Sequence, residues 1–525
     1  MRKYQSISYS LLFIIISLFQ VANLHPKPPR LTIVFIIDQL PYQTLINLYP
    51  HLRSGLKFFM DNGVNYVNTY VPHARPSTAT AHVGLNTGTY AKDHGIIFNL
   101  WFDQQTNTMV ESDNDTAVNA AVFSPEGIYD YGKSAHYIMV DGLSDQFVLQ
   151  SKPDAPHQAV SIALKSRSAI GTANKLGKAI WFDDKTGFFT SSKAYFDKFP
   201  DWLQTFNKEK KINQLSHVQW KPAYPLDSPA YNFNRIVNYT YAKSTGLVGE
   251  VIPIEKQKST PYQLFCRTPH ANQLIFDLAR EYVSNYMQQK PNNHLLLWVC
   301  LSSLDKVGHE YGPERIEAID MLYHLDQQIT HFINAIQKMI DPQEILFALT
   351  ADHGTSPIVE LLYEEGISFA RRINEQQFID QINSHIKNKY SVTDFVKALQ
   401  LPNLYLDQSI LDSFSPDTQK LIITDLKNFL RQQPGIKQVW TYEELHRACF
   451  SAQEIEDYFK KQLFLGRSGS LIIQVHPYVY LISEEKGADH VSPYNYDTHV
   501  PLILYQQGKL GRKKIIERVW LLQLA

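Results

Sequence analysis

Seven oxygen- and nitrogen-bearing side chains stand at or just past the ends of apolar runs that are spread over most of the chain. They are Asp38, Thr78, Asp305, His309, Asp352, His353 and His499. Three of these runs are expected to be buried strands, and an aspartate follows each within a few residues: 31–37 (LTIVFII), 294–301 (HLLLWVCL) and 344–350 (EILFALT). In open α/β sheets, sites assemble beyond the carboxyl ends of the strands. Carboxylates and imidazoles that converge there are ligands for zinc or similar divalent ions. The pattern therefore predicts a metal-dependent enzyme.

Two pairs among these residues have spacings that suit metal binding. Asp305 and His309 are four residues apart, which on a helical turn places both side chains on one face. Asp352 and His353 are adjacent and directly follow an apolar run, so at a strand end they can diverge toward different ions. The next residue, Gly354, allows a sharp exit of the chain. An Asp-x-x-x-His pair is common by itself, so the prediction depends on the whole set.

Similar residues elsewhere in the chain lack this context. Asp93-His94-Gly95 repeats the tripeptide at 352–354, and Asp489-His490 repeats the Asp-His pair, but neither follows a long apolar run. We interpret both as structural. The histidines at 73, 82 and 157 are likewise expected to be packing or surface residues.

The segment around Thr78 has the composition of a helix start. Residues 75–82 (RPSTATAH) and 83–88 (VGLNTG) combine small side chains with hydroxyls. At a helix N-terminus the backbone N–H groups and the helix dipole favour a bound anion. The same residues also suit a helix that is merely capped by Ser77 or Thr78. Spacing alone favours the capped helix.

Hydrophobic periodicity indicates the elements that position these residues. Residues 315–340 have apolar side chains three and four apart, as in an amphipathic helix that packs on a sheet. Strands and helices that alternate around strand-end ligands predict a doubly wound, mostly parallel α/β sheet with helices on both faces. Two polar stretches, about 155–270 and 359–472, are expected to be insertions beside the site. Both belong to a single catalytic domain over 25–525.

Composition limits the classes of partner. Apolar residues make up 44% of the 525 residues and charged residues 19%, as in an ordinary packed globule. The net charge of −1 and the lack of a long basic block give no electrostatic case for nucleic acid or an anionic membrane. Arg2 and Lys3 precede a short apolar stretch at 11–21, and a proline-rich break follows it. This layout predicts a signal peptide over 1–24 and a secreted or periplasmic protein. The apolar stretch is shorter than the ~20 residues of a spanning helix, so a retained anchor is the weaker alternative.

An ordered set of motifs resembles the alkaline phosphatase superfamily, particularly its nucleotide pyrophosphatase/phosphodiesterase and PafA-type phosphatase branches. The resemblance begins at 76–88 (PSTATAHVGLNTG) and 93–96 (DHGI). It extends to Asp38, to the pairs at 305/309 and 352/353, and to residues 496–502 (YDTHVPL). It therefore covers nearly the whole chain after the N-terminal segment.

The resemblance implies a role for each residue that matches the family pattern. Thr78 is implied as the nucleophile, which forms a phosphoryl-enzyme intermediate, and Asn99 as a contact to the phosphoryl group. Two zinc ions per chain are implied, and their ligands divide into two sets. One set is Asp305, His309 and His499, and the other is Asp38, Asp352, His353 and the Thr78 oxygen.

A pair of cations bears on which ester is cut. Lys165 and Arg167 are at i and i+2, so they share one face if the backbone there is extended. Spacing alone indicates a solvated basic turn, but such a Lys-x-Arg pair resembles the one that distinguishes PafA-type monoesterases from diesterases. An Arg fork and a Lys charge suit the dianion of a phosphate monoester. The implied substrates are small phosphate monoesters, and the natural substrate and oligomeric state stay open. The alternatives are a nucleotide pyrophosphatase/phosphodiesterase and a non-catalytic phosphate-binding relative.

The resemblance ends near residues 504–505. The chain then ends in a segment unlike the family pattern (511–525, GRKKIIERVWLLQLA). From this difference we expect that apolar sheet surface is left uncovered, at about 1.5–3 kcal/mol for each exposed large side chain.

Overall fold

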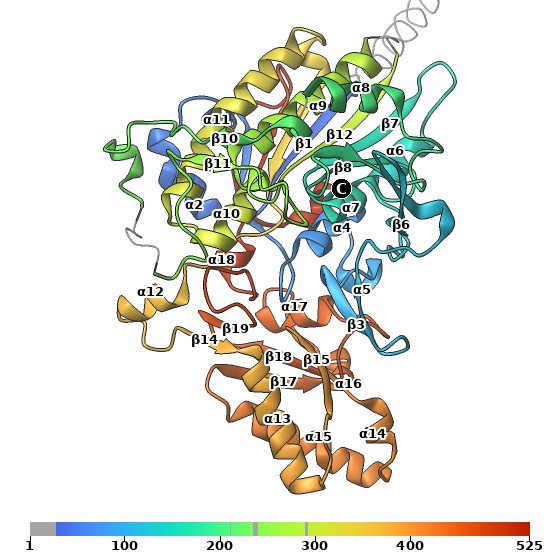
Figure 1. Ribbon diagram of the computed structural model, residues 1–525, viewed down its shortest axis with the longest axis vertical. Coiled ribbons are helices and arrows are strands. Elements are labelled where there is room, and N and C mark those ends of the chain that lie inside the picture. Colours follow the sequence, from blue (N-terminus) through green and yellow to red (C-terminus); the bar gives the residue numbers. More distant parts are fainter. Residues whose placement is uncertain (1–27, 211, 235–239, 289–291) are drawn as a thin grey trace, which may run out of the picture.

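The apolar runs that precede the candidate ligands become neighbouring strands in the centre of a nine-stranded sheet (Figure 1). The computed structural model describes residues 28–210, 212–234, 240–288 and 292–525. Within it β1 (Leu31–Ile37) lies between β12 (His294–Leu301) and β13 (Ile345–Thr350), parallel to both. The strand order is β21-β2-β20-β13-β1-β12-β7-β8-β9. The remaining strands are β2 (Val64–Tyr70), β7 (His157–Ala163), β8 (Lys178–Asp183), β9 (Phe188–Thr190), β20 (Leu502–Tyr505) and β21 (Lys513–Trp520).

The sheet is mostly parallel. The pairs formed by β7 with β12 and with β8 are parallel, as is the pair of β2 with β21. The pairs β2–β20, β13–β20 and β8–β9 are antiparallel. The predicted doubly wound, mostly parallel α/β architecture is therefore confirmed.

Helices cover both faces of this sheet. On one face the ring of Phe35 contacts rings from three helices, namely Phe59 of α3 (Gly55–Asn62), Phe276 of α9 (Pro269–Met287) and Phe332 of α11 (Ile316–Gln337). Ile162 of β7 is in register with Phe35 of β1, so both side chains point to the same face of the sheet. The side chain of the preceding residue, Ser161, therefore points to the opposite face. There Thr172 of α7 (Ser166–Ala173) donates a hydrogen bond to Ser161 at 2.7 Å. Helix α4 (Thr78–Thr87) packs beside α7.

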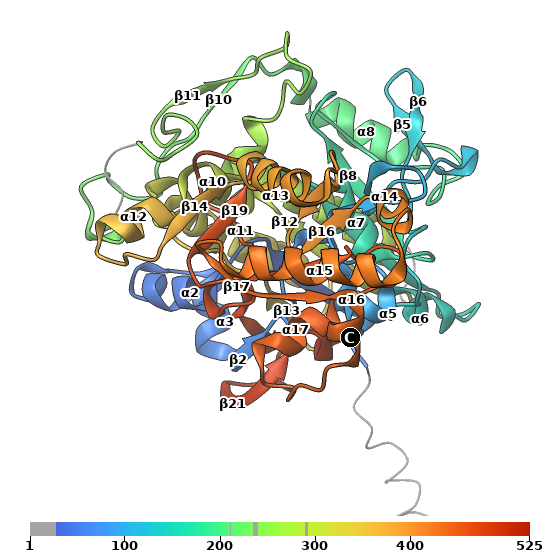
Figure 2. The same cartoon turned by 90° about the horizontal axis from the view of Figure 1, so that it is seen from below.

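A second, smaller sheet forms below the first in Figure 1 and has its own apolar core. Its strand order is β15-β16-β18-β17. Helices α13 and α15 lie across it in the view from below (Figure 2). The bounds of these elements are α13 (Glu375–Tyr390), β15 (Val396–Gln400), β16 (Asn403–Leu406), α15 (Pro416–Arg431), β17 (Ile436–Thr441) and β18 (Leu471–Val475). They occupy the region where the second insertion is expected, and extend slightly beyond it.

The first expected insertion begins later than the sequence suggested. Residues 157–190 supply β7, β8 and β9 of the central sheet, so the prediction of an insertion from about 155 is wrong for this part. The peripheral segment that follows contains α8 (Asp201–Lys210), β10 (His217–Gln219) and β11 (Val251–Pro253). The two short strands pair with each other and not with the central sheet.

The C-terminal segment completes one edge of the central sheet. Strand β21 pairs in parallel with β2, and the turn after it, η7 (Leu521–Leu524), packs on α4. Leu521 and Leu522 are buried, and Leu522 lies so close to Gly84 of α4 that an added Cβ there would be 2.7 Å from its Cδ2. These leucines are therefore covered, whereas Ile516 of β21 is 71% exposed, so the expectation of uncovered apolar sheet surface stays a prediction.

The predicted signal peptide over 1–24 lies outside the described residues. Among the helices that are described, none combines the length and the apolar composition that crossing a membrane requires.

Candidate functional site

Four adjacent parallel strands end at the same edge of the sheet, and each delivers polar side chains there. Asp38 follows β1, and Asp352 and His353 follow β13. Asp305 lies in α10 (Ser303–Tyr311), directly after β12, and Lys165 follows β7. Because parallel strands have their carboxyl ends on one side, residues far apart in sequence meet in this crevice.

Asp38, Asp352 and His353 form one group that can hold a metal ion, with one ligand atom from each within 4.8 Å of the others. His353 Nε2 is 3.5 Å from both Asp38 Oδ1 and Asp352 Oδ2. Among the described residues, none of these three buried atoms has a hydrogen-bond partner. Buried polar atoms without partners are costly, and a shared cation would satisfy all three. An added Cβ on Gly354 would lie 2.1 Å from the Tyr496 carbonyl oxygen, so this glycine permits close packing beside the group.

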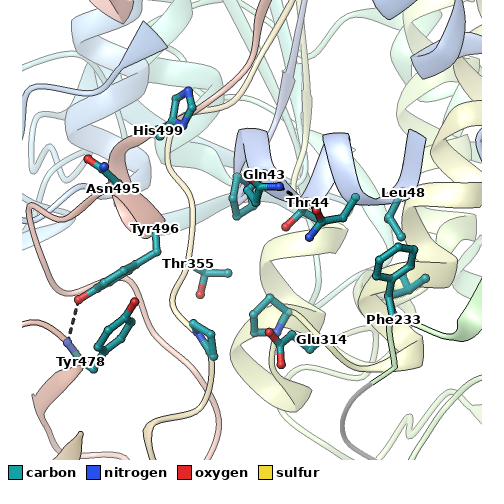
Figure 3. Close-up of a pocket in the computed structure, with 15 residues that line it drawn as sticks. Gln43, Thr44, Leu48, Phe233, Glu314, Thr355, Tyr478, Asn495, Tyr496 and His499 are labelled. Atoms are coloured by element: carbon teal, nitrogen blue, oxygen red, sulfur yellow. Dashed lines mark hydrogen bonds between the residues drawn. The ribbon is translucent and has the colours of Figure 1, made fainter. Parts of the chain in front are cut away.

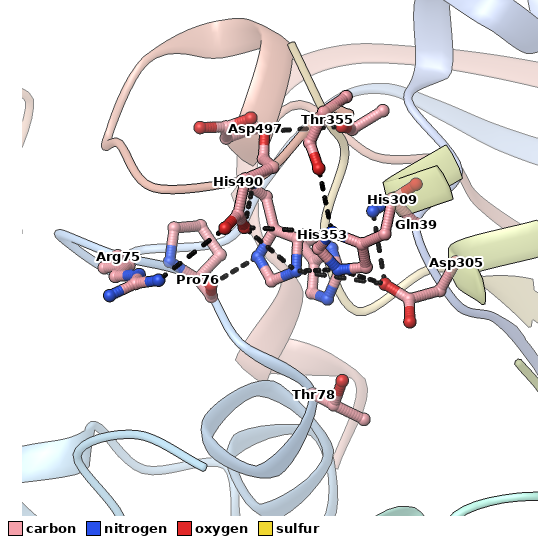
Figure 4. Close-up of polar contacts among 12 residues, drawn as sticks. Gln39, Arg75, Pro76, Thr78, Asp305, His309, His353, Thr355, His490 and Asp497 are labelled. Carbon is pink, nitrogen blue, oxygen red and sulfur yellow. Dashed lines mark hydrogen bonds and ion pairs between the residues drawn. The ribbon is translucent and has the colours of Figure 1, made fainter. Parts of the chain in front are cut away.

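Asp305, His309 and His490 form a second such group (Figure 4). His309 Nδ1 donates to the Ala488 carbonyl at 2.9 Å, and His490 Nδ1 donates to the Pro76 carbonyl at 2.9 Å. When both rings are neutral, their Nε2 atoms therefore both present lone pairs, and these two atoms lie only 3.2 Å apart. Burial lowers the pKa of His490 to about 3, whereas Asp305 outweighs burial at His309 and raises its pKa to about 9. Facing lone pairs need a proton or a cation between them, so this group also fits a metal ion.

His499 lies away from both groups. Its Nε2 donates to the Val67 carbonyl at 2.8 Å, and its ring packs between those of Tyr42 and Tyr70, at 5.0 and 4.7 Å. It lines a separate pocket of about 490 Å³ (Figure 3). Other residues of that pocket include Gln43, Thr44, Tyr478, Asn495 and Tyr496.

The prediction of His499 as a metal ligand is therefore wrong, as is the interpretation of Asp489-His490 as structural. His490 lies on the loop between β19 (Val479–Ile482) and α18 (Asn495–Thr498), which carries it back over the edge of the central sheet. The repeat of the Asp-His pair was the sequence signal for this site. The strand-end pattern does not include this pair, because no long apolar run directly precedes it.

Thr78 is the first residue of α4 and is 1% exposed. Ser77 is the N-cap residue, but its side chain makes no capping hydrogen bond and instead contacts the Thr80 hydroxyl at 2.9 Å. Asn99 takes over part of this role, because its side-chain oxygen accepts the Ala79 N–H at 2.9 Å. The bond fixes the Asn99 amide beside Thr78, and its NH₂ group is a donor with no partner in the described part of the chain.

The Lys165 ammonium contacts Thr78 and one carboxylate from each of the two metal-ligand groups. Its Nζ lies 2.6 Å from Asp38 Oδ2, 2.5 Å from Asp305 Oδ2 and 3.3 Å from Thr78 Oγ1. Burial disfavours this charge, but Asp305 and Asp38 outweigh it and raise the pKa of Lys165. Lys165 therefore compensates two buried carboxylates at the point where the candidate nucleophile lies.

Lys165 and Arg167 do not share an extended strand. Lys165 is the N-cap of α7 and Arg167 lies in its first turn, so the assumption of extended backbone is wrong. Both nevertheless line one pocket of about 530 Å³. Between them, Ser166 Oγ donates to Asp113 Oδ2 at 2.5 Å, which anchors the start of the helix.

Sequence reasoning missed Gln39, which links the two metal-ligand groups. Its backbone N–H donates to Asp352 Oδ1 at 3.1 Å, and its side-chain Nε2 donates to Asp305 Oδ1 at 3.2 Å. Its φ of 68° is uncommon for a residue with a side chain. Gly308 makes room for it, since an added Cβ there would lie 1.6 Å from Gln39 Oε1. His82, expected to be a packing residue, has its Nδ1 3.4 Å from Asp352 Oδ2.

Comparison with known proteins identifies the family. The model of type I phosphodiesterases / nucleotide pyrophosphatases matches residues 32–500. The chain belongs to this family. A protein of Myroides odoratus named calcium-transporting ATPase is 26% identical to it, covering 92% of this chain and 88% of the relative. Alkaline phosphatase PafA of Elizabethkingia meningoseptica is 25% identical, covering 93% and 89%. A crystal structure of alkaline phosphatase PafA superposes with a TM-score of 0.82 at 23% identity, covering 95% of each chain. The fold is thus that of the alkaline phosphatases.

Proposed function

We propose that the chain is an exported alkaline phosphatase that hydrolyses small phosphate monoesters with Thr78 as nucleophile. One observation carries the proposal. The Thr78 hydroxyl lies 3.3 Å from an ammonium that also contacts one carboxylate of each metal-ligand group. A relative at 25% identity over nearly its full length is named an alkaline phosphatase, which supports the same activity. The name of the Myroides relative also specifies phosphoryl transfer to water, from ATP.

The reaction proceeds by two displacements at phosphorus. The Thr78 hydroxyl releases its proton to solvent and its oxygen forms a bond to phosphorus while the bond to the ester oxygen breaks, and the departing oxygen takes a proton from solvent. Water then attacks the phosphothreonine, which releases inorganic phosphate and restores the hydroxyl. Two zinc ions, one in each ligand group, would supply Lewis-acid stabilisation of the charge on the attacking and leaving oxygens.

The other side chains bind the phosphoryl group. Asn99 Oδ1 accepts the Ala79 N–H, which fixes the Asn99 amide beside Thr78, so its NH₂ can donate to a phosphoryl oxygen. Arg167 Nε is buried and has no hydrogen-bond partner among the described residues, which suits an anionic acceptor. The Lys165 ammonium is within hydrogen-bonding reach of Thr78 Oγ1 and therefore of an oxygen on phosphorus.

These two cations favour a monoester over a diester. A monoester dianion has a second charged oxygen where a diester carries an ester group. Only the monoester can therefore pair with both Lys165 and Arg167. The description of the family favours the rival function, a nucleotide pyrophosphatase/phosphodiesterase. Thr78, Asn99 and the metal ligands would serve both reactions.

The test compares 4-nitrophenyl phosphate with its methyl diester on zinc-loaded protein. We expect the monoester to have the higher kcat/KM. The double variant Lys165→Ala/Arg167→Ala should lower that preference by at least about 100-fold, since each hydrogen bond to a charged group contributes about 1.5–3 kcal/mol. Lys175→Ala, which removes an exposed lysine paired with Asp141, is the matched control and should keep it. A diester preference that survives the double substitution would refute the monoesterase assignment.

The same preparation tests the non-catalytic alternative. We expect about two zinc ions per chain, because each ligand group offers three protein ligands. Less than one bound zinc together with no hydrolysis after zinc addition would support a phosphate-binding relative without turnover. Export is tested by following the chain, expressed with residues 1–24, into the periplasmic fraction.

A further inference from the structure

The pocket of about 530 Å³ next to Lys165 and Arg167 extends outward from the proposed phosphoryl site. Its walls come from the start of α7, from the hairpin of β8 and β9 and from the first turn of α10. A phosphoryl group held by Lys165 and Arg167 lies at its inner end, so the remainder of a substrate can occupy the rest.

Positive side chains outnumber carboxylates on the walls of this pocket. Two of the cations are already paired. Lys165 binds Asp38 and Asp305, and Lys133 binds Asp113 and Glu111 at 2.7 and 2.9 Å. The charges of Lys133 and Lys165 are therefore balanced by carboxylates of the protein.

Three further cations line the pocket, namely Arg167, Lys185 and Lys306. Within the described part of the chain, none of them has a carboxylate oxygen within 4.0 Å. Arg167 is assigned above to the phosphoryl group. Lys185 is exposed and its ammonium lies over the ring of Tyr131, 5.2 Å from the centroid. Lys306 thus has neither an ion-pair partner nor an assigned role.

Lys306 is the cation best placed to act on the bound substrate. It follows Asp305 directly in α10 and is half-buried, so its charge is less screened by water than that of Lys185. Across the pocket, burial raises the pKa of Asp184 and the positive charge of Lys306 opposes that rise. Lys306 and Asp184 both line the pocket, so the charge of Lys306 acts on groups inside it. Asp183 is not an ion-pair partner of Lys306 among the described residues, and its carboxylate instead accepts hydrogen bonds from Tyr129 and Thr186.

We propose that Lys306 forms a second anion subsite, so that the enzyme prefers phosphate monoesters whose leaving group carries its own negative charge. The inference rests on the proposed phosphomonoesterase function and specifies its substrate class. The chemistry recognised is a carboxylate or a second phosphate on the departing alcohol, within reach of the ammonium once the ester phosphate is held by Lys165 and Arg167.

The test uses two esters that differ in charge and hardly in size, 4-carboxyphenyl phosphate and 4-carbamoylphenyl phosphate. The measured quantity is the ratio of their kcat/KM values, because a general loss of activity cancels in it. We expect the wild type to favour the carboxylate. Lys306→Gln should lower the ratio about tenfold, as expected for the loss of one charge-assisted hydrogen bond. Lys306→Arg should retain most of it.

Lys175→Gln, a neutralised exposed lysine outside the pocket, should leave the ratio unchanged. Equal kcat/KM values for the two esters in the wild type would overturn the subsite, as would a preference that survives Lys306→Gln. Hydrolysis of neither ester by zinc-loaded protein would instead overturn the proposed function, and the subsite with it.

Discussion

The most discriminating prediction concerns the histidine that completes the second metal-ligand group. His490→Ala removes a ring whose Nε2 lies 3.2 Å from His309 Nε2 and whose Nδ1 is held by the Pro76 carbonyl. Loss of an outer partner of a metal ligand alone lowers metal affinity about 10–100-fold. Loss of one of three direct protein ligands should therefore lower it by at least about 100-fold, or about 2.7 kcal/mol. The first group, which contains Asp38, should keep its ion.

His499→Ala is the matched comparison. It removes a hydrogen bond of about 1 kcal/mol to the Val67 carbonyl. It also removes ring contacts to Tyr42 and Tyr70, at about 0.5–1.5 kcal/mol each. The free energy of unfolding of this variant should fall by about 2–4 kcal/mol, and its metal affinity should stay unchanged.

The assay is metal analysis after dialysis against a weak chelator, combined with urea unfolding of the same samples. His490→Ala should fall from about two zinc ions per chain to about one, and His499→Ala should retain about two. The reverse result, with zinc lost from His499→Ala and retained by His490→Ala, would refute the assignment of the ligands from this geometry. About two zinc ions per chain in both variants would show that His490 does not bind the ion.

Three further substitutions test other parts of the site. Thr78→Ala should abolish phosphate release from a monoester while zinc content stays largely unchanged; wild-type turnover in this variant would exclude Thr78 as the nucleophile. Gly308→Ala should displace the Gln39 side chain from its hydrogen bond to the Asp305 carboxylate. The free energy of unfolding should fall by about 1–2 kcal/mol, because the better helix propensity of alanine offsets part of the loss. Unchanged stability and zinc content would contradict the linking role of Gln39. Asp113→Ala should loosen the start of α7, which Ser166 anchors, and lower monoester kcat/KM about tenfold without loss of zinc; unchanged kcat/KM would show that this anchor is not needed.

The sequence predicted the centre of the fold well, because the three apolar runs there are strands, in each of which all but one residue is buried. In β1 and β12 nearly every side chain is buried on one face of the sheet or the other, so the apolar runs are continuous and easily identified. The outer strands carry weaker signals. Strand β7 begins with polar residues (HQAVSIA), and β21 is an edge strand with mostly exposed side chains (KKIIERVW). Their place in the sheet depends on tertiary pairing, which local patterns do not encode.

The same distinction explains the error at His490. The strand-end rule locates ligands that the central sheet itself carries, such as Asp38 and Asp352. His490 instead arrives on a loop that follows β19, a strand paired with β14 (Arg371–Asn374) outside the central sheet.

This loop binds the rim of the site through its own contacts. Asp489 Oδ2 lies 3.9 Å from the Arg75 guanidinium, and His490 donates to the carbonyl of the next residue, Pro76. Arg75 and Pro76 lie just before Thr78, the first residue of α4. A loop from outside the central sheet therefore supplies a candidate metal ligand and at the same time contacts the residues that lead to Thr78. No periodicity within residues 483–494 reveals this, because the contacts that fix the loop are made to residues about 400 positions earlier in the chain.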